Sequence, residues 1–259
     1  MLSVLLRFFW IGCCAVAMLL QTLVLLDKPL AGQWLLIGFV FGATLFGYQF
    51  TRPEPWQRRL AYIAGVGAWC CLLWLPRSMS LQVLAPAIVW ALYYFAGARS
   101  LRRLRFLKPV SIAFAWAWVT VWLPLDIGQW PETSLIFAGR AIFFFILALA
   151  CDLMDLHYDR QHELPTLVQH LGESNTFKWI DKAMMAAGLV CIINYLCKIY
   201  SLWAMSALMM SLVWSAWWLR FIRNKRNGEQ WGKFWIDALM VMQFVLVLGS
   251  KVLHSFLWE

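Results

Sequence analysis

Long apolar stretches separated by short polar ones dominate this chain. A helix needs about 20 mostly apolar residues to cross the hydrocarbon core of a membrane. Nine stretches approach that length, and they cover approximately residues 8–26, 32–50, 60–76, 80–98, 109–125, 134–151, 182–198, 202–220 and 235–253. We therefore predict an all-α fold, a polytopic membrane bundle of nine transmembrane helices that forms a single domain over residues 1–259.

Composition supports the membrane interpretation. Hydrophobic residues make up 63% of the 259 residues, and charged residues make up only 14%. A soluble domain of this size needs more charge to cover its surface. The seven cysteines lie in or beside the apolar stretches, at spacings that suggest neither a zinc site nor a disulfide framework. These features exclude a soluble globular domain.

The basic residues are distributed asymmetrically between the two sides of the predicted bundle. If the nine stretches cross in turn, 17 of the 22 Lys and Arg residues fall on one side and Arg140 lies within the sixth stretch. The remaining four fall on the other side, and they are Lys28, Arg77, Lys198 and Lys251. Cytoplasmic loops of membrane proteins collect Lys and Arg. We therefore expect a cytoplasmic N-terminus and an external C-terminus.

The same asymmetry accounts for the net charge of +9 without a nucleic-acid partner. We expect a multi-pass integral protein of a bacterial inner membrane, with the loops after the second, fourth, sixth and eighth stretches in the cytoplasm. The longest of these polar connections follows residue 151. Candidate chemistry is therefore expected on the cytoplasmic side.

Three aspartates mark the point where the sixth stretch reaches the cytoplasm. Asp152, Asp155 and Asp159 have the spacing i, i+3 and i+7, which on a helix places their carboxylates within about 60° of one another. Such carboxylates repel each other unless a cation neutralises them. Mg²⁺ prefers oxygen ligands of this kind and often bridges them to phosphate oxygens. The alternative is a solvated face with acids gathered by chance.

Basic residues are available on the same predicted side. Lys108 opens the fifth stretch and Arg52 follows the second. Each of them could be a topological anchor. Together with a carboxylate cluster they also describe a diphosphate site. Arg140 either faces the bundle interior, where ionisable residues are often functional, or extends its side chain to the nearer surface.

With these residues in place, the chain resembles the UbiA-type intramembrane prenyltransferase superfamily. The resemblance covers the whole chain in architecture and is most specific at the second acidic motif. The family has Asp-x-x-Asp-x-x-x-Asp, a basic residue, then Thr-Leu and a Gly. The matching residues here are Asp152, Asp155, Asp159, Arg160, Thr166, Leu167 and Gly172. The segment Leu104–Pro109 resembles the family's Lys-bearing connection, which implies that Lys108 binds diphosphate.

The first acidic motif departs from the family. The pattern Asn-x-x-x-Asp-x-x-x-Asp is replaced by a segment in which Gln49, Pro53 and Gln57 stand at the three motif positions. Glu54 is the acidic residue nearby. Without the two aspartates, a second Mg²⁺ has few ligands in this segment.

The resemblance implies transfer of an isoprenyl group from an isoprenoid diphosphate to a lipophilic or aromatic acceptor in the membrane. Asp152, Asp155 and Asp159 would be the catalytic residues and the ligands of Mg²⁺. The diphosphate would be bound by Lys108, Arg52, Arg160 and Gln49. Aromatic faces such as Tyr48, Trp116 and Trp118 would stabilise an allylic cation.

Two other functions remain open from the sequence. A degenerate member of the family would bind a polyprenyl phosphate, or a partner enzyme, without catalysis, which the altered first motif favours. A transporter is the other alternative, although such folds usually show internal repeats and interrupted helices near the membrane centre. Neither feature is evident in this sequence.

Overall fold

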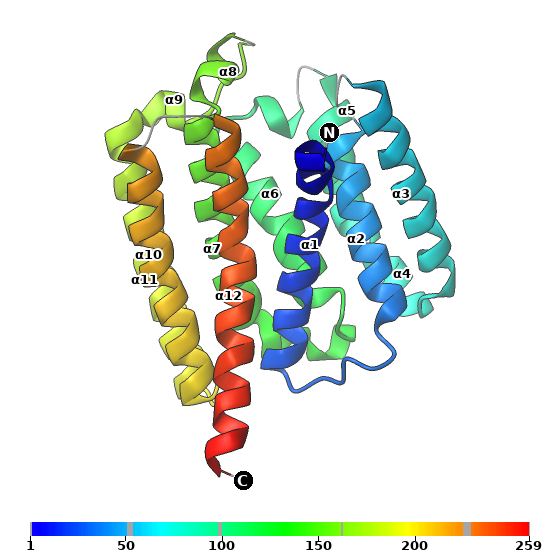
Figure 1. Cartoon of the computed structure of the whole chain (residues 1–259), viewed down its shortest axis with the longest axis vertical. Coiled ribbons are helices and arrows are strands. Elements are labelled where there is room, and N and C mark those ends of the chain that lie inside the picture. Colours follow the sequence, from blue (N-terminus) through cyan, green and yellow to red (C-terminus); the bar gives the residue numbers. More distant parts are fainter. Residues whose placement is uncertain (1, 51–53, 98–99, 162, 225–228, 259) are drawn as a thin grey trace.

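The computed structural model describes residues 2–50, 54–97, 100–161, 163–224 and 229–258, in which all regular secondary structure is helical (Figure 1). The α-helices are α1 (Leu2–Leu25), α2 (Trp34–Gln49), α3 (Pro55–Trp74), α4 (Arg77–Gln82), α5 (Leu84–Phe95), α6 (Leu107–Ala117), α7 (Trp130–Met154), α8 (Leu156–Gln161), α9 (Leu167–Leu171), α10 (Glu173–Leu196), α11 (Leu202–Asn224) and α12 (Glu229–Trp258). The shorter turns are η2 (Leu101–Arg103), η3 (Trp118–Trp122) and η4 (Ile127–Gln129).

Each of the nine predicted stretches coincides with helical structure. The fourth is divided into α4 and α5, and the fifth is α6 continued by η3, a π-helical turn. Five helical segments of the described chain are long and apolar enough to span a membrane, and they are Arg77–Phe95, Ile127–Met154, Glu173–Leu196, Leu202–Ile222 and Gly232–Phe256. The prediction of a helical membrane protein is therefore confirmed, whereas the number of nine crossings stays a prediction.

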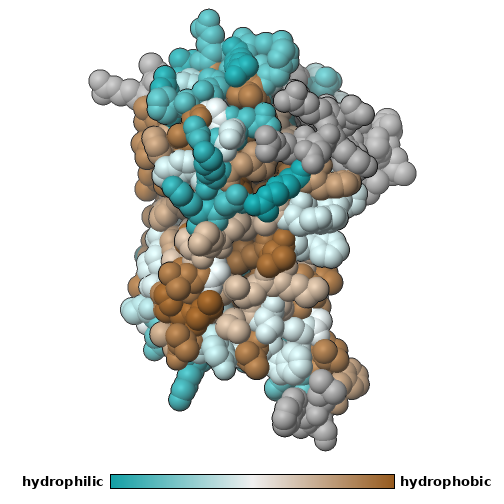
Figure 2. Space-filling view, turned by 90° about the vertical axis from the view of Figure 1, so that its left-hand side faces the viewer, coloured by the Kyte–Doolittle hydropathy of each residue, from teal (hydrophilic) through white to brown (hydrophobic). Residues whose placement is uncertain are grey.

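The helices run approximately parallel to one long axis (Figure 1). The start of α1 lies at the same end of the bundle as α8 and α9, and the end of α12 lies at the opposite end. Hydrophilic residues gather at the α8 and α9 end, and hydrophobic surface is more frequent lower down (Figure 2). The polar segment after α7 is therefore concentrated at one end of the molecule.

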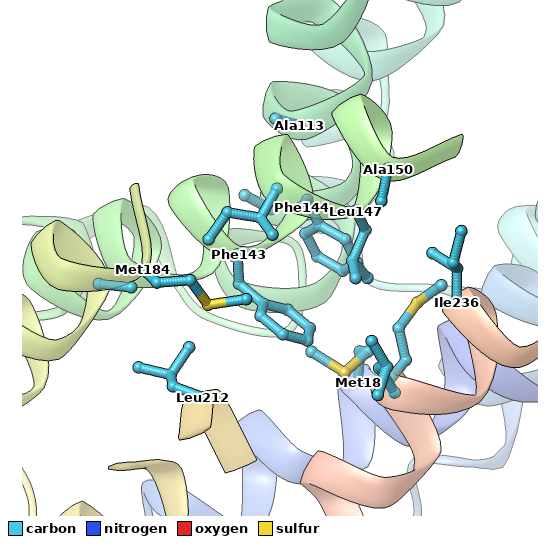
Figure 3. Packing of buried hydrophobic residues seen from close by; sticks show 14 of the residues in the cluster. Met18, Ala113, Phe143, Phe144, Leu147, Ala150, Met184, Leu212 and Ile236 are labelled. Carbon is cyan, nitrogen blue, oxygen red and sulfur yellow. The ribbon is translucent and has the colours of Figure 1, made fainter. Parts of the chain in front are cut away.

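Most of the helices contribute to one large hydrophobic core. Met18 of α1, Phe143 of α7 and Ile236 of α12 belong to it, and side chains of α6, α10 and α11 converge on the same cluster (Figure 3). A second cluster joins α1 to α2 and α3 through Leu19, Val40 and Ala68. Helix α1 therefore links the two parts of the bundle.

Many large apolar side chains instead face outward. Met185 on α10 and Val213 on α11 are 76% and 68% exposed. Exposed apolar surface of this kind is expected for a protein whose solvent is lipid, because outward-facing apolar groups then meet hydrocarbon rather than water. The outward faces of α10 and α11 are therefore suited to contact lipid.

Candidate functional site

The acidic motif lies at a break between two helices. Helix α7 ends at Met154, and α8 begins at Leu156. Asp155 lies at the junction, where its amide still donates to the carbonyl of Cys151 at 2.9 Å. The α-helical ladder is partly kept, since the amide of Asp159 donates to the carbonyl of Asp155 at 2.8 Å. The three aspartates consequently come from two helices and their junction rather than from one continuous helix.

Lys108 lies between two of the aspartates. Its ammonium is 2.7 Å from a carboxylate oxygen of Asp152 and 3.0 Å from one of Asp159. All three residues are buried, with exposed fractions of 6% for Lys108, 4% for Asp152 and 3% for Asp159. Buried charges persist in proteins only when they are paired. The first turn of α6 thus brings the predicted diphosphate-binding lysine to the predicted carboxylate cluster.

Asp155 has a different partner. Its carboxylate forms an ion pair with Lys233 of α12, and both side chains are partly exposed. The three aspartates and two lysines together carry one net negative charge. Lys233 is one of the 17 basic residues that the sequence predicts on the cytoplasmic side, and no motif points to it as part of the site. The positions of α7 and α12 in the bundle place it there.

Oδ2 of Asp152 is a buried carboxylate oxygen of the cluster. It accepts no hydrogen bond from the residues that the structure describes. Such an atom calls for an explanation, and an absent cation is one. However, no group of three or more His, Cys, Asp or Glu side chains among the described residues is arranged to hold a metal ion. The residues fit Mg²⁺ bound through one or two carboxylates and phosphate oxygens, rather than a cage built by the protein alone.

The other predicted site residues are less closely grouped. Gln49 is the last residue of α2 and is buried, whereas Arg160 on α8 is exposed. Within the described chain, Arg160 forms no ion pair with the three aspartates. Arg52 and Pro53 lie outside the described residues. Glu54, which precedes α3, is exposed.

The remaining motif residues shape the backbone after the aspartates. Thr166 is fully buried and caps α9, because its hydroxyl accepts a hydrogen bond from the amide of Gln169 at 3.3 Å. Gly172 joins α9 to α10 with φ of 76°, a conformation that favours glycine. These residues set the course of the backbone that leads from α8 to α10.

The three candidate aromatic residues separate into two groups. Trp116 donates a hydrogen bond to the Tyr48 hydroxyl at 3.0 Å and packs on Phe144, with ring centroids 5.0 Å apart. Trp118 instead donates to the carbonyl of Gln82 at 3.0 Å and packs against other tryptophans. Tyr48 and Trp116 therefore form one contacting pair, and Trp118 belongs to a separate group of tryptophans.

A further acidic residue, which the sequence pattern did not single out, belongs to this region. Asp237 lies one helical turn after Lys233 on α12, within the ninth predicted stretch, and within electrostatic range of Tyr48 and Cys151. Its backbone carbonyl accepts a weak hydrogen bond from the Cys14 thiol at 3.4 Å. The rule that singled out Arg140, an ionisable residue inside an apolar stretch, applies equally to Asp237.

Arg140 itself is buried in the bundle and does not extend to the surface. Its guanidinium donates to the carbonyl of Met18 at 2.9 Å and to the hydroxyl of Thr22 at 3.3 Å. Both acceptors belong to α1. Arg140 therefore ties α7 to α1 through polar groups within the core, away from the aspartates.

No protein-family model matches the chain, and no curated protein matches it in sequence. A match does exist among solved structures. The structure of a digeranylgeranylglyceryl phosphate synthase, a UbiA-type intramembrane prenyltransferase, aligns over 94% of both chains with a TM-score of 0.61 and 11% sequence identity. Since the identity is low, this likeness concerns the arrangement of the helices. The chain therefore has the fold of a UbiA-type intramembrane prenyltransferase, as its second acidic motif predicts.

Proposed function

We propose that this protein transfers an isoprenyl group from an isoprenoid diphosphate to a lipophilic or aromatic acceptor within the membrane. The observation that carries the proposal is Lys108, buried between Asp152 and Asp159 at the polar end of a prenyltransferase-like fold. A buried lysine beside carboxylates provides both a group that binds phosphate and groups that bind a phosphate-linked cation. The proposal is further supported by the position of these groups at one end of α6 and α7, whose remaining residues are mostly apolar and would accompany a prenyl chain into the membrane.

In this reaction the bond between the allylic carbon and the diphosphate oxygen breaks, and the diphosphate leaves with the electron pair. A nucleophilic atom of the acceptor then bonds to that carbon and releases a proton. Lys108 and Lys233 would bind the diphosphate oxygens, for which they would leave their present carboxylate partners. One or two of the carboxylates of Asp152, Asp155 and Asp159 would hold Mg²⁺ together with phosphate oxygens, and the bound ion would supply positive charge to the diphosphate. The Tyr48 and Trp116 rings would face the allylic carbon and exclude water.

The first test removes the carboxylate at the junction of α7 and α8. We expect Asp155→Ala to lower product formation at least 100-fold. Removal of one group that stabilises charge in a transition state commonly lowers the rate by about 10²–10³. The assay incubates purified protein with allylic diphosphates of several lengths and follows product by mass spectrometry. Chelation of Mg²⁺ by EDTA should abolish the same activity, and added Mg²⁺ should restore it.

A matched control removes a carboxylate elsewhere. Asp181 forms an ion pair with Arg220 at 2.7 Å, with both side chains about half exposed. Asp181→Ala should leave product formation unchanged. If Asp155→Ala keeps both turnover and diphosphate binding at the level of the unaltered protein, the proposed function is wrong.

A second candidate function is binding of a polyprenyl phosphate without catalysis. The observation that favours it is the segment that joins α2 to α3, where Gln49 is buried, Glu54 is exposed and the aspartates of the first motif are absent. Detectable turnover of any allylic diphosphate would exclude this alternative. Saturable binding of a polyprenyl phosphate that requires Lys108, with no product from any tested diphosphate, would support the binding function over the transferase function.

A further inference from the structure

A large cavity opens at the end of the bundle opposite the aspartates. It has a volume of about 710 Å³ and lies between the end of α1, the α10–α11 connection and the end of α12 (Figure 1). Pockets for small molecules usually enclose about 300–1,000 Å³. The cavity is therefore large enough for part of a lipid.

The wall of this cavity combines apolar and cationic groups. Leu25, Ala204 and Val247 contribute apolar surface, and Lys198 and Lys251 contribute positive charge. The Lys251 ammonium pairs with the Asp27 carboxylate and also donates to the carbonyl of Val24 at 3.3 Å. Lys198 has no ion-pair partner among the described residues. One positive charge therefore remains uncompensated in the wall.

The positive-inside rule does not explain these two lysines. The end of α12 is the end that we expect outside the cytoplasm, and only Lys28, Arg77, Lys198 and Lys251 are assigned to that side. Two of these four residues line one cavity. Since topology favours few basic residues on this side and Asp27 compensates Lys251, Lys198 calls for a local reason, such as a bound anion.

The backbone at Lys198 is also unusual. Its φ of 60° lies in the left-handed region, which costs a lysine free energy and suits glycine. Asp27, on the facing connection, has φ of 52°. Both residues follow the last turn of a helix, where a left-handed residue closes the helix end, since the amides of Lys28 and Ile199 donate back to the carbonyls of Leu23 and Asn194 at 2.9 Å. These two helix ends fix the positions of Asp27 and Lys198 at the mouth of the cavity.

Tyr200 supplies a neutral donor deeper in the same cavity. The residue is 8% exposed, and burial raises the pKa of its phenol above the ordinary value. It also lines a smaller adjoining cavity that contains Arg140. Hydrogen-bond donors therefore continue from the cavity toward the interior, where the Tyr200 hydroxyl and the Arg140 guanidinium would each suit a hydrogen-bond acceptor or an anion.

The surroundings of the cavity connect it to lipid. Leu196 and Leu202, on either side of the α10–α11 connection, are 70% and 53% exposed, and Trp203 lines the cavity itself. Tryptophan is typical of the boundary between hydrocarbon and head groups. A ligand that enters here comes from a membrane surface more readily than from bulk water.

We propose that this cavity binds an anionic glycerophospholipid, with its phosphate at Lys198, Lys251 and Tyr200 and part of an acyl chain along Leu25, Ala204 and Val247. This site is separate from the aspartate cluster and does not depend on the proposed transferase activity. Its ligand chemistry is a phosphate group attached to an apolar chain.

The test uses purified, delipidated full-length protein and native mass spectrometry, with phosphatidylglycerol, phosphatidylcholine and inorganic phosphate as separate probes. The test variant is Lys198→Gly, because glycine suits the left-handed backbone and should not weaken the fold. We expect its affinity for phosphatidylglycerol to fall about fivefold, since one basic residue near a membrane surface contributes about 1 kcal/mol. Lys198→Arg should retain the affinity.

Arg77→Ala is the matched control, since it removes one positive charge from the same predicted side but does not line the cavity. It should bind phosphatidylglycerol as the unaltered protein does. Equal losses in Lys198→Gly and Arg77→Ala would overturn the proposal, as would equal affinity of the unaltered protein for phosphatidylglycerol and phosphatidylcholine. Competition by inorganic phosphate at similar concentration would show that the site takes a free anion and would also overturn it.

Discussion

Lys108 is the residue whose removal should affect the aspartate cluster most. It is buried and compensates two buried carboxylates at once. Breaking a buried ion pair by deleting one partner leaves an uncompensated charge and costs about 3–5 kcal/mol. We therefore expect Lys108→Met to lower the free energy of unfolding by about that amount, measured by thermal unfolding in detergent.

A compensating variant distinguishes two causes of the expected stability loss at Lys108, namely unpaired carboxylate charge and altered packing. If the loss comes from unpaired carboxylates, Asp152→Asn and Asp159→Asn introduced together with Lys108→Met should restore most of the stability. A triple variant as unstable as Lys108→Met alone would show that unpaired carboxylate charge is not the cause of the loss. The exposed pair of Asp181 and Arg220 provides the comparison, because such pairs contribute only about 0–1 kcal/mol.

At the scale of elements, α2 and α3 pack closely through glycine. A Cβ atom added at Gly42 would lie 2.6 Å from the backbone carbonyl oxygen of Ala64. Backbone cannot move aside as a flexible side chain can, so the two helices would have to separate. We expect Gly42→Ala to destabilise the protein by about 1–3 kcal/mol, the usual cost of overpacking.

Gly67 of α3 is the matched control for this prediction. A Cβ atom there meets nothing within 4 Å. Since alanine is favoured over glycine inside a helix by about 0.5–1 kcal/mol, Gly67→Ala should leave the unfolding temperature unchanged or raise it. Equal behaviour of the two variants would contradict the close approach of α2 and α3.

For the whole molecule, the prediction concerns the two ends of the chain. The start of α1 and the end of α12 lie at opposite ends of the bundle (Figure 1), and the basic residues predict which end is cytoplasmic. We expect a fluorescent protein fused at the N-terminus to be bright, and alkaline phosphatase fused after Glu259 to be active. An inactive phosphatase with a fluorescent C-terminal fusion would place both ends in the cytoplasm and contradict the predicted crossings.

The orientation also bears on the proposed function. The aspartates lie at the same end as the start of α1, so a cytoplasmic N-terminus gives them access to cytoplasmic diphosphates. The reversed orientation would remove that access. The fusion experiment therefore tests a requirement of the transferase proposal as well as the topology.

Features that depend on local pattern follow from the amino-acid sequence without the structure. Apolar length predicted the helices, and the spacing of Asp152, Asp155 and Asp159 predicted a grouped set of carboxylates next to the membrane. The acidic motif also predicted the fold, although sequence identity to the matching structure is only 11%. These patterns can be recognised in the sequence because a lipid environment requires long apolar stretches and a helix repeats at a fixed spacing.

Which charged side chains form ion pairs follows from the packing of the helices against one another. Lys108 and Asp159 are 51 residues apart in the sequence. Many other Lys and Arg residues also lie beside apolar stretches, so the sequence does not single out Lys108 as the partner of the aspartates. Packing of α6 on α7 selected Lys108, and packing of α12 beside α7 selected Lys233, whereas Arg160 stayed on the surface despite lying next to Asp159. These ion pairs depend on the relative positions of helices, which no local sequence pattern encodes. A charged side chain pairs with an opposite charge only when the fold brings the two within a few ångströms.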